Sequence, residues 1–111
     1  RIVAVFQPHR FTRVRDLLED FARSFNLANH VVVCPIYRAG ESPIEGLDEW
    51  RVAGALRDHG HRSVQAVTDL DGGAAHLGSF VQPGDVVITL GAGNVNQLCG
   101  RLAAAVGARG L

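Results

Sequence analysis

The sequence predicts an α/β fold of the Rossmann-like type: a mostly parallel sheet of about four strands, in the order 3-2-1-4, with helices on both faces. Short runs rich in Val and Ile alternate four times with longer segments that repeat their apolar side chains at helical spacing. This alternation is typical of right-handed strand–helix–strand crossovers. The apolar runs are continuous, which indicates strands that are buried on both faces.

The first half of the chain contains two strand–helix units. Residues 2–6 are a continuous apolar run that predicts the first strand, and residues 13–26 follow as a helix with its apolar positions on one face. Thr12 is placed to cap that helix. Residues 30–37 predict the second strand. A loop punctuated by Gly and Pro then leads to a helix over residues 47–60, whose final glycine suits a C-terminal cap.

The second half of the chain repeats the pattern. Residues 64–68 predict a short third strand, and residues 70–81 a helix that its three glycines weaken. A turn over residues 82–85 leads to a fourth buried strand at residues 86–90. Residues 91–106 then predict a tight turn followed by the final helix.

Length and charge limit the classes of function. The 111 residues fit one domain spanning 1–111, and eleven arginines balance eleven acidic residues, with no lysine. Balanced charge argues against nonspecific binding to nucleic acid or to acidic membranes. No apolar run approaches the roughly 18 residues of a membrane span. We therefore expect a cytoplasmic protein that has neither nucleic acid nor membrane as a partner.

Histidines and cysteines show no metal-ligand spacing, so we expect no metal site. Cys34 and Cys99 are far apart in the sequence, and we expect both to be small buried side chains rather than a disulfide. His59 and His61 flank a glycine after a helix and are expected at the surface.

The strand order predicts where a ligand binds. In a sheet of order 3-2-1-4 the order reverses between the first and fourth strands, and ligands bind beyond the carboxyl ends of the strands at such a point. The two loops at this position, QPHRFT at residues 7–12 and GAGNV at residues 91–95, are also the most distinctive loops in the chain. We expect the site between them.

The first of these loops combines His9, Arg10 and Arg13 at the start of a helix, where the helix dipole disfavours each cation by roughly 0.3–1 kcal/mol. Misfits of this kind are expected at functional sites. Two guanidinium groups three positions apart can converge on one carboxylate or phosphate, with His9 as a third donor. The alternative is a solvated basic patch that pairs with the acidic residues of the helix: Asp16, Glu19 and Asp20.

The second loop contains glycines that permit a sharp turn, Gly91 and Gly93, and Asn94 can cap the helix that follows. The third glycine of a dinucleotide motif is replaced by Asn96, which favours a tight turn that lines a neighbouring site over a cofactor-binding loop. Glu41, in the loop after the second strand, is either functional or simply solvated.

Three segments carry a resemblance to a known family: VFQPHRFTRVRDLLEDF, YRAGESPIEG and GDVVITLGAGNV. In this order and spacing they resemble the C-terminal domain of the Mur ligases of peptidoglycan synthesis, in the branch that adds L-alanine to UDP-N-acetylmuramate. The resemblance covers residues 1–105. Two departures are Phe11, where tyrosine is common, and Asn94, where aspartate is often seen.

The resemblance implies a Rossmann-like domain that closes over the active site of a three-domain ligase, in which the central domain holds ATP and magnesium. It implies that Arg10 and Arg13, with His9 beside them, hold the carboxylate of L-alanine while its amine attacks an acyl-phosphate. The first and central domains are then partners within the same chain. We expect no catalytic residue and no bound cofactor in this piece alone, and an isolated piece that is inactive.

Two alternatives remain open from the sequence. One is another Mur ligase, such as the one that recycles murein peptides. The other is a free-standing Rossmann-like module for a nucleotide or a metabolite anion. The missing methionine and the start within a strand-like run favour an excised piece of a longer chain over a free-standing module.

Overall fold

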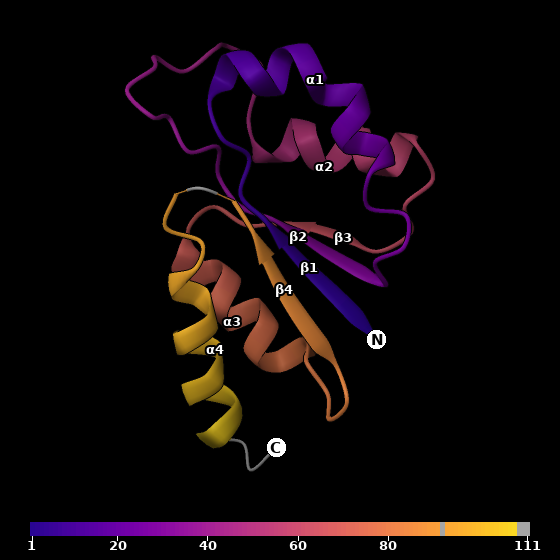
Figure 1. The fold of residues 1–111 in the computed structure, drawn as a ribbon, viewed down its shortest axis with the longest axis vertical. Helices are drawn as coiled ribbons and strands as arrows, with labels where there is room; N and C mark the ends of the chain where they lie inside the picture. The colour runs from indigo at the N-terminus through magenta and orange to yellow at the C-terminus, as the bar shows by residue number, and fades with distance from the viewer. Residues whose placement is uncertain (92, 109–111) are drawn as a thin grey trace.

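The computed structural model describes residues 1–91 and 93–108, in which strands and helices alternate along the chain (Figure 1). The elements are β1 (Ile2–Phe6), α1 (Phe11–Arg23), β2 (His30–Val33), α2 (Glu49–Asp58), β3 (Val64–Ala66), α3 (Leu70–Phe80), β4 (Val86–Leu90) and α4 (Gln97–Ala108). None of these helices is long and apolar enough to cross a lipid bilayer.

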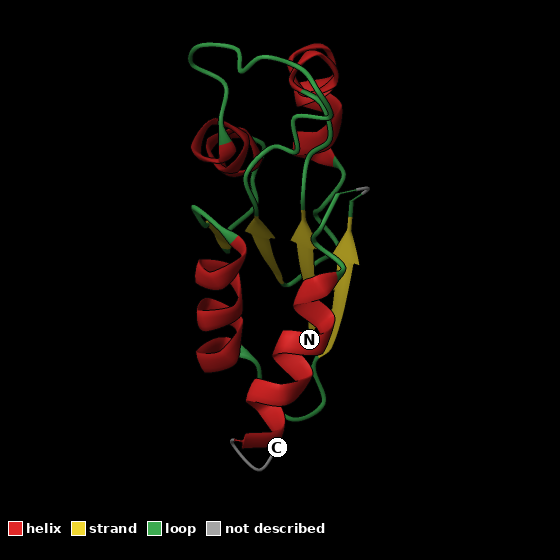
Figure 2. Cartoon of the chain, turned by 90° about the vertical axis from the view of Figure 1, so that its left-hand side faces the viewer, coloured by secondary structure: helices red, strands yellow, loops and turns green. Residues whose placement is uncertain are grey.

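The four strands form one parallel sheet in the order β3-β2-β1-β4, which confirms the predicted α/β class and strand order. β1 is central and pairs with β2 on one side and with β4 on the other. The helices form two pairs, α1 with α2 and α3 with α4, which are separate in both views (Figure 1, Figure 2).

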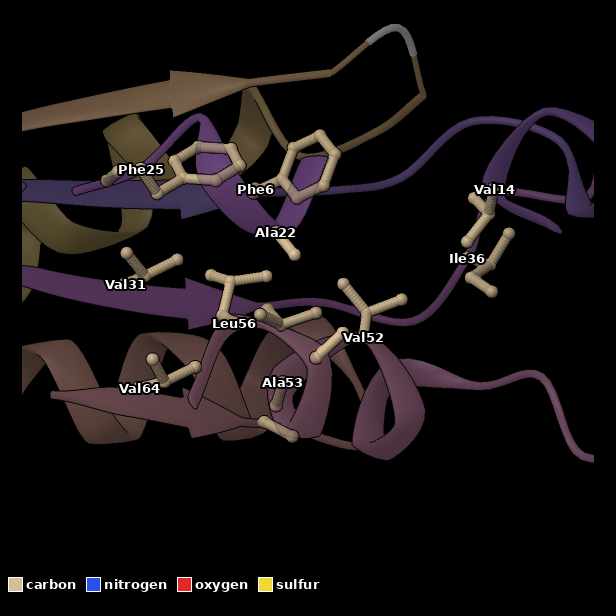
Figure 3. Packing of buried hydrophobic residues seen from close by; sticks show 14 of the residues in the cluster. Phe6, Val14, Ala22, Phe25, Val31, Ile36, Val52, Ala53, Leu56 and Val64 are labelled. Carbon is tan, nitrogen blue, oxygen red and sulfur yellow. The ribbon is translucent and has the colours of Figure 1, made fainter. Parts of the chain in front are cut away.

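Each helix pair packs on its own hydrophobic core, because successive side chains of a strand point to opposite faces. Ala4 and Phe6 of β1 belong to the core under α1 and α2, whereas Val3 and Val5 belong to the core under α3 and α4. Figure 3 shows the first core, where the Phe6 ring lies 4.9 Å from the Phe25 ring, centroid to centroid. The cores fix both faces of β1, the strand that leads into the predicted site.

β4 differs from its prediction as a buried strand. Val86, Ile88 and Leu90 each expose two-fifths or more of their surface, as does Ile2 beside them on β1. β4 is an edge strand, and the core under α1 and α2 includes none of its residues. Only its other face is covered, through Val87 in the second core.

The start of α1 also differs from the prediction. The helix begins at Phe11, with Arg10 at the N-cap position, so the predicted capping role of Thr12 is wrong. β2 is shorter than predicted and ends at Val33, because Pro35 has no N–H to continue the ladder.

The C-terminal cap of α2 is confirmed. Gly60 has a φ of 97°, and the N–H of His61 donates to the carbonyl of Leu56 at 3.0 Å, as in a Schellman motif. The surface position predicted for His61 is wrong: its ring is buried and its Nε2 lies 2.9 Å from the carbonyl oxygen of Ala28. The turn at the helix end directs this ring inward.

The two cysteines lie in different environments. Cys34 is buried as predicted, and burial raises the pKa of its thiol to about 11. Cys99 is exposed on α4, which makes its predicted burial wrong. Helical periodicity alone does not show which face of α4 packs on the sheet; Leu98 and Leu102 are on that face, and Cys99 is not.

Candidate functional site

The candidate site lies at the carboxyl ends of β1, β2 and β4. The chain leaving β1 and the chain leaving β4 run side by side there (Figure 1), and the N–H of Gln7 donates to the carbonyl of Leu90 at 2.9 Å. The N–H of Cys34 donates to the carbonyl of Phe6 at 2.8 Å on the other side. The strand order therefore brings together the two loops that the sequence singled out, and adds the loop after β2.

Backbone hydrogen bonds join the β1 loop to the β2 loop. The N–H of Tyr37 donates to the carbonyl of Pro8, and the N–H of Arg10 donates to the carbonyl of Tyr37, both at 2.8 Å. The rings of His9 and Tyr37 stack with an interplanar angle of 10° and centroids 5.6 Å apart. His9 is thereby half-buried and held against Tyr37, a residue that the sequence analysis did not identify.

The backbone at Arg10 has φ 68° and ψ 131°, a combination that residues other than glycine rarely adopt. Strain of this kind costs about 1–3 kcal/mol and persists where the surroundings impose it. Here the surroundings are the hydrogen bond from Arg10 to Tyr37 on one side and the first turn of α1 on the other. The result is a fixed position for the arginine at the entry to the helix.

The guanidinium groups of Arg10 and Arg13 are exposed, and neither forms a hydrogen bond or an ion pair with any residue that the structure describes. The alternative of a patch paired with nearby acids does not hold for them. Asp16 pairs with Arg15 at 2.9 Å, and Glu19 lies 3.3 Å from Arg23. Arg10 and Arg13 are thus free to bind an anion.

Gln7 connects the β1 loop to the glycine loop. Its side chain is buried, its Nε2 donates to Asn94 Oδ1 at 2.9 Å, and its Oε1 accepts from the N–H of Val95 at 3.1 Å. The predicted capping role of Asn94 is wrong, because α4 begins at Gln97 and the Asn94 side chain pairs with Gln7 instead.

The glycines of this loop are required by close packing. A Cβ at Gly91, where φ is 155°, would lie 2.8 Å from the Gln7 carbonyl oxygen. A Cβ at Gly93 would lie 2.6 Å from Gln7 Oε1 and 2.7 Å from the Tyr37 ring. These contacts favour the interpretation of the glycine loop as a tight turn that lines a neighbouring site over its interpretation as a cofactor-binding loop. Ala92, between them, lies outside the described residues.

Glu41 provides the anion that the start of α1 lacks in its own sequence. Its carboxylate accepts from the Thr12 hydroxyl at 2.6 Å and from the Thr12 N–H at 3.2 Å. The pKa of the Glu41 carboxyl is lowered from its usual value, mainly by the hydrogen bond from the Thr12 hydroxyl. Backbone N–H groups and the charge of Arg10 have smaller effects in the same direction. Of the two alternatives for Glu41, a carboxylate that is simply solvated is therefore wrong.

An open hollow of about 400 Å³ lies beside these loops, lined by Gln7, Asn94 and residues 35–40. Tyr37 and Arg38 form part of its wall, and Arg10 and Arg13 are outside it. Within the described ranges, no three His, Cys, Asp or Glu side chains are grouped so that they could hold a metal ion. What the arrangement offers chemically is positive charge and hydrogen-bond donors.

Comparisons with known proteins identify the family to which the chain belongs. A family model described as "Mur ligase, glutamate ligase domain" matches residues 1–93. The chain is 50% identical over 98 residues to a UDP-N-acetylmuramate–L-alanine ligase of Syntrophotalea carbinolica, which is 88% of this chain and 21% of the relative. It is 50% identical over 97 residues to the ligase of the same name from Geobacter sulfurreducens, again 21% of that protein.

A third relative with that name, from Methylobacterium nodulans, is 46% identical over 108 residues, or 94% of this chain and 23% of the relative. The chain therefore spans about a fifth of the length of the relatives it matches. The family model covers β1 to β4, the first two segments on which the resemblance rests, and the third segment as far as residue 93. On these matches, the chain belongs to the Mur ligase family and represents its C-terminal, glutamate ligase domain.

Proposed function

We propose that this chain is the amino-acid-binding, closing domain of a longer three-domain ligase that joins L-alanine to UDP-N-acetylmuramate in peptidoglycan synthesis. The observation that carries the proposal is a pair of exposed arginines at the start of α1, Arg10 and Arg13, whose guanidinium groups make no hydrogen bond or ion pair with the described residues. The names of the relatives support alanine as the amino acid and do not favour the peptide-recycling ligase.

In this proposal Arg10 and Arg13 hold the carboxylate of L-alanine. Guanidinium groups bind carboxylates through directed, charge-assisted hydrogen bonds and remain protonated at any physiological pH. His9 stands next to Arg10 and is restrained by its stacking on Tyr37, so it adds a donor of fixed orientation. The chain contributes positioning and charge neutralisation, which place the amine of alanine toward an activated carboxyl group.

The remaining chemistry belongs to parts of the enzyme outside residues 1–111. ATP and magnesium would activate the carboxyl group of UDP-N-acetylmuramate in the central domain, and the domain described here would close over it and exclude water. This proposal places the enzyme in the cytoplasm and predicts that residues 1–111 alone have no ligase activity. Gly91, Gly93 and Asn94 would line the site without binding a cofactor themselves.

The test is to replace Arg10 or Arg13 by alanine in the full-length ligase. A hydrogen bond to a charged group contributes about 1.5–3 kcal/mol, so we expect kcat/KM for L-alanine to fall roughly 10- to 100-fold in each variant. The KM values for ATP and for the UDP-sugar should stay near those of the parent.

Arg15→Ala is the matched control, because Arg15 lies on the same helix and already pairs with Asp16 at 2.9 Å. It should leave the kinetics with L-alanine unchanged. If the Arg10 and Arg13 variants kept both the parent KM for L-alanine and the parent turnover, the clamp would be assigned to the wrong residues.

A further inference from the structure

We propose that Glu41 is a positioning residue for the arginine pair: it caps α1 from a separate loop and thereby sets where Arg10 and Arg13 present their guanidinium groups. The inference rests on the proposed function, because it concerns the same carboxylate site. It assigns a role to a residue that does not itself touch the substrate.

The start of α1 lacks a cap of its own. Arg10 occupies the N-cap position and makes no side-chain capping bond, and the first turn contains no acidic residue. The first N–H groups of a helix need acceptors, and basic side chains in the first turn repel the helix dipole. The first turn of α1 therefore needs an acceptor and a negative charge that come from outside the turn.

Glu41 supplies that anion from 29 residues further along the chain. One carboxylate oxygen accepts from the Thr12 N–H at 3.2 Å, and the other accepts from the Thr12 hydroxyl at 2.6 Å. The N–H of Phe11 also interacts with this carboxylate and helps to lower its pKa, after the larger effect of the Thr12 hydroxyl. A carboxylate at this place does what an N-cap aspartate does in other helices.

The loop that presents Glu41 is itself built to hold it. Ala39 and Gly40 both have positive φ, 50° and 85°, which turns the chain back toward α1. The N–H of Glu41 donates to the carbonyl of Arg38 at 2.9 Å, and Arg38 Nε donates back to the Glu41 carbonyl at 3.1 Å. These bonds hold the backbone of Glu41 within its own loop, and from that position the carboxylate reaches Thr12.

Two consequences follow for the arginine pair. Phe11 and Thr12 lie between Arg10 and Arg13 in the sequence, so pinning their N–H groups fixes the backbone on which both arginines are mounted. Glu41 also occupies N–H groups that a substrate carboxylate would otherwise reach. The substrate is left to the guanidinium groups, which can orient it through directed hydrogen bonds.

The experiment compares Glu41→Ala and Glu41→Gln in the full-length ligase. In Glu41→Ala the cap is lost, and we expect KM for L-alanine to rise about tenfold with little change in kcat. A helix cap contributes a free energy that corresponds to roughly a factor of ten in an equilibrium constant. Glu41→Gln keeps an oxygen acceptor, so its KM for L-alanine should stay within about threefold of the parent. The KM for ATP should not change in either variant.

Asp69→Ala is the matched control for a general loss of stability. Asp69 caps α3 by accepting from the Gly72 N–H at 2.6 Å, on the other face of the sheet. This variant should lower the melting temperature about as much as Glu41→Ala and leave KM for L-alanine unchanged. Equal increases in KM in both variants would show that Glu41 acts only through stability and would overturn its positioning role.

The same substitution is then made in an Arg10→Ala/Arg13→Ala background. If Glu41 acts through the two arginines, Glu41→Ala should change kcat/KM less than twofold there. If the arginine variants raise KM for L-alanine but Glu41→Ala alone does not, only the role of Glu41 is overturned. If the arginine variants have no effect, the proposed function fails, and the role of Glu41 fails with it.

Discussion

At the scale of single residues, Arg10 combines an unfavourable backbone with an unpaired side chain. Its φ of 68° is imposed by the hydrogen bond from its N–H to Tyr37 and by the start of α1. The exposed guanidinium makes no hydrogen bond to the described residues, although its charge helps to lower the pKa of Glu41. A position that is strained and still carries a charged side chain fits a functional role better than a structural one.

Arg10→Gly should therefore stabilise the chain while it weakens substrate binding. Glycine accepts positive φ without the clash of a Cβ, and we expect the free energy of unfolding to rise by about 1 kcal/mol. Urea denaturation of the chain measures this. Arg13→Gly is the control, because glycine inside α1 should lower the free energy of unfolding by about 1 kcal/mol. A loss of stability in both variants would contradict strain at Arg10.

At the scale of elements, three loops meet at the candidate site, and one buried side chain bridges two of them. Gln7 follows β1, and its amide bonds to Asn94 and to the N–H of Val95 after β4. Gly93 lets the glycine loop approach Gln7 and Tyr37 closely enough for this packing. The spacing between the carboxyl ends of the strands thus depends on a missing Cβ as much as on hydrogen bonds.

Gly93→Ala should disturb this contact. Its new Cβ would lie 2.6 Å from Gln7 Oε1, and overpacking of this kind lowers the free energy of unfolding by about 1–3 kcal/mol. Gly100→Ala, in the exposed interior of α4 with nothing within 4 Å of the new Cβ, should instead raise it by about 1 kcal/mol. Urea denaturation of both variants gives the comparison, and a silent Gly93→Ala would refute the close packing.

At the scale of the whole molecule, a histidine pair joins the sheet to α3 at the edge opposite the site. His30 Nε2 of β2 lies 2.8 Å from His76 Nε2 of α3, and His30 Nδ1 lies 2.6 Å from Ser63 Oγ. Burial is the largest of the effects that lower the pKa of His30 to about 4. The nearby charges of His76, His61 and Arg1 have smaller effects in the same direction. Burial also lowers the pKa of His76.

The stability of the chain should therefore fall in mild acid. An unfolded histidine binds a proton near pH 6.5, whereas folded His30 does so only near pH 4. The stabilisation is complete above pH 6.5 and is lost as the pH falls toward 4, on the order of 2 kcal/mol. Urea denaturation between pH 7 and pH 4 should show this slope, and His30→Leu should flatten it. An equal slope in the variant would assign the effect to other groups.

The sequence was sufficient for the fold class and the strand order, and the strand order brings the two predicted loops together. These follow from continuous apolar runs and from the handedness of crossovers, which are local or general properties. It was insufficient for β4, whose exposed Val86, Ile88 and Leu90 look like core residues in the sequence. An apolar run shows that a strand can be buried, but the neighbouring helices and strands determine which of its faces is covered.

The candidate site divides in the same way. By itself the sequence predicted a role for His9, Arg10 and Arg13, because cations at a helix start conflict with the helix dipole whatever the surroundings. Only the tertiary structure showed that Glu41 accepts hydrogen bonds from Thr12 at the start of α1, that Gln7 bridges two loops, and that Arg10 has a strained backbone. Each of these depends on partners 27 or more positions away in the chain, and such contacts leave no periodic pattern in the sequence. Residue chemistry is thus determined locally, whereas the geometry that directs it arises when the parallel sheet brings the ends of β1, β2 and β4 together.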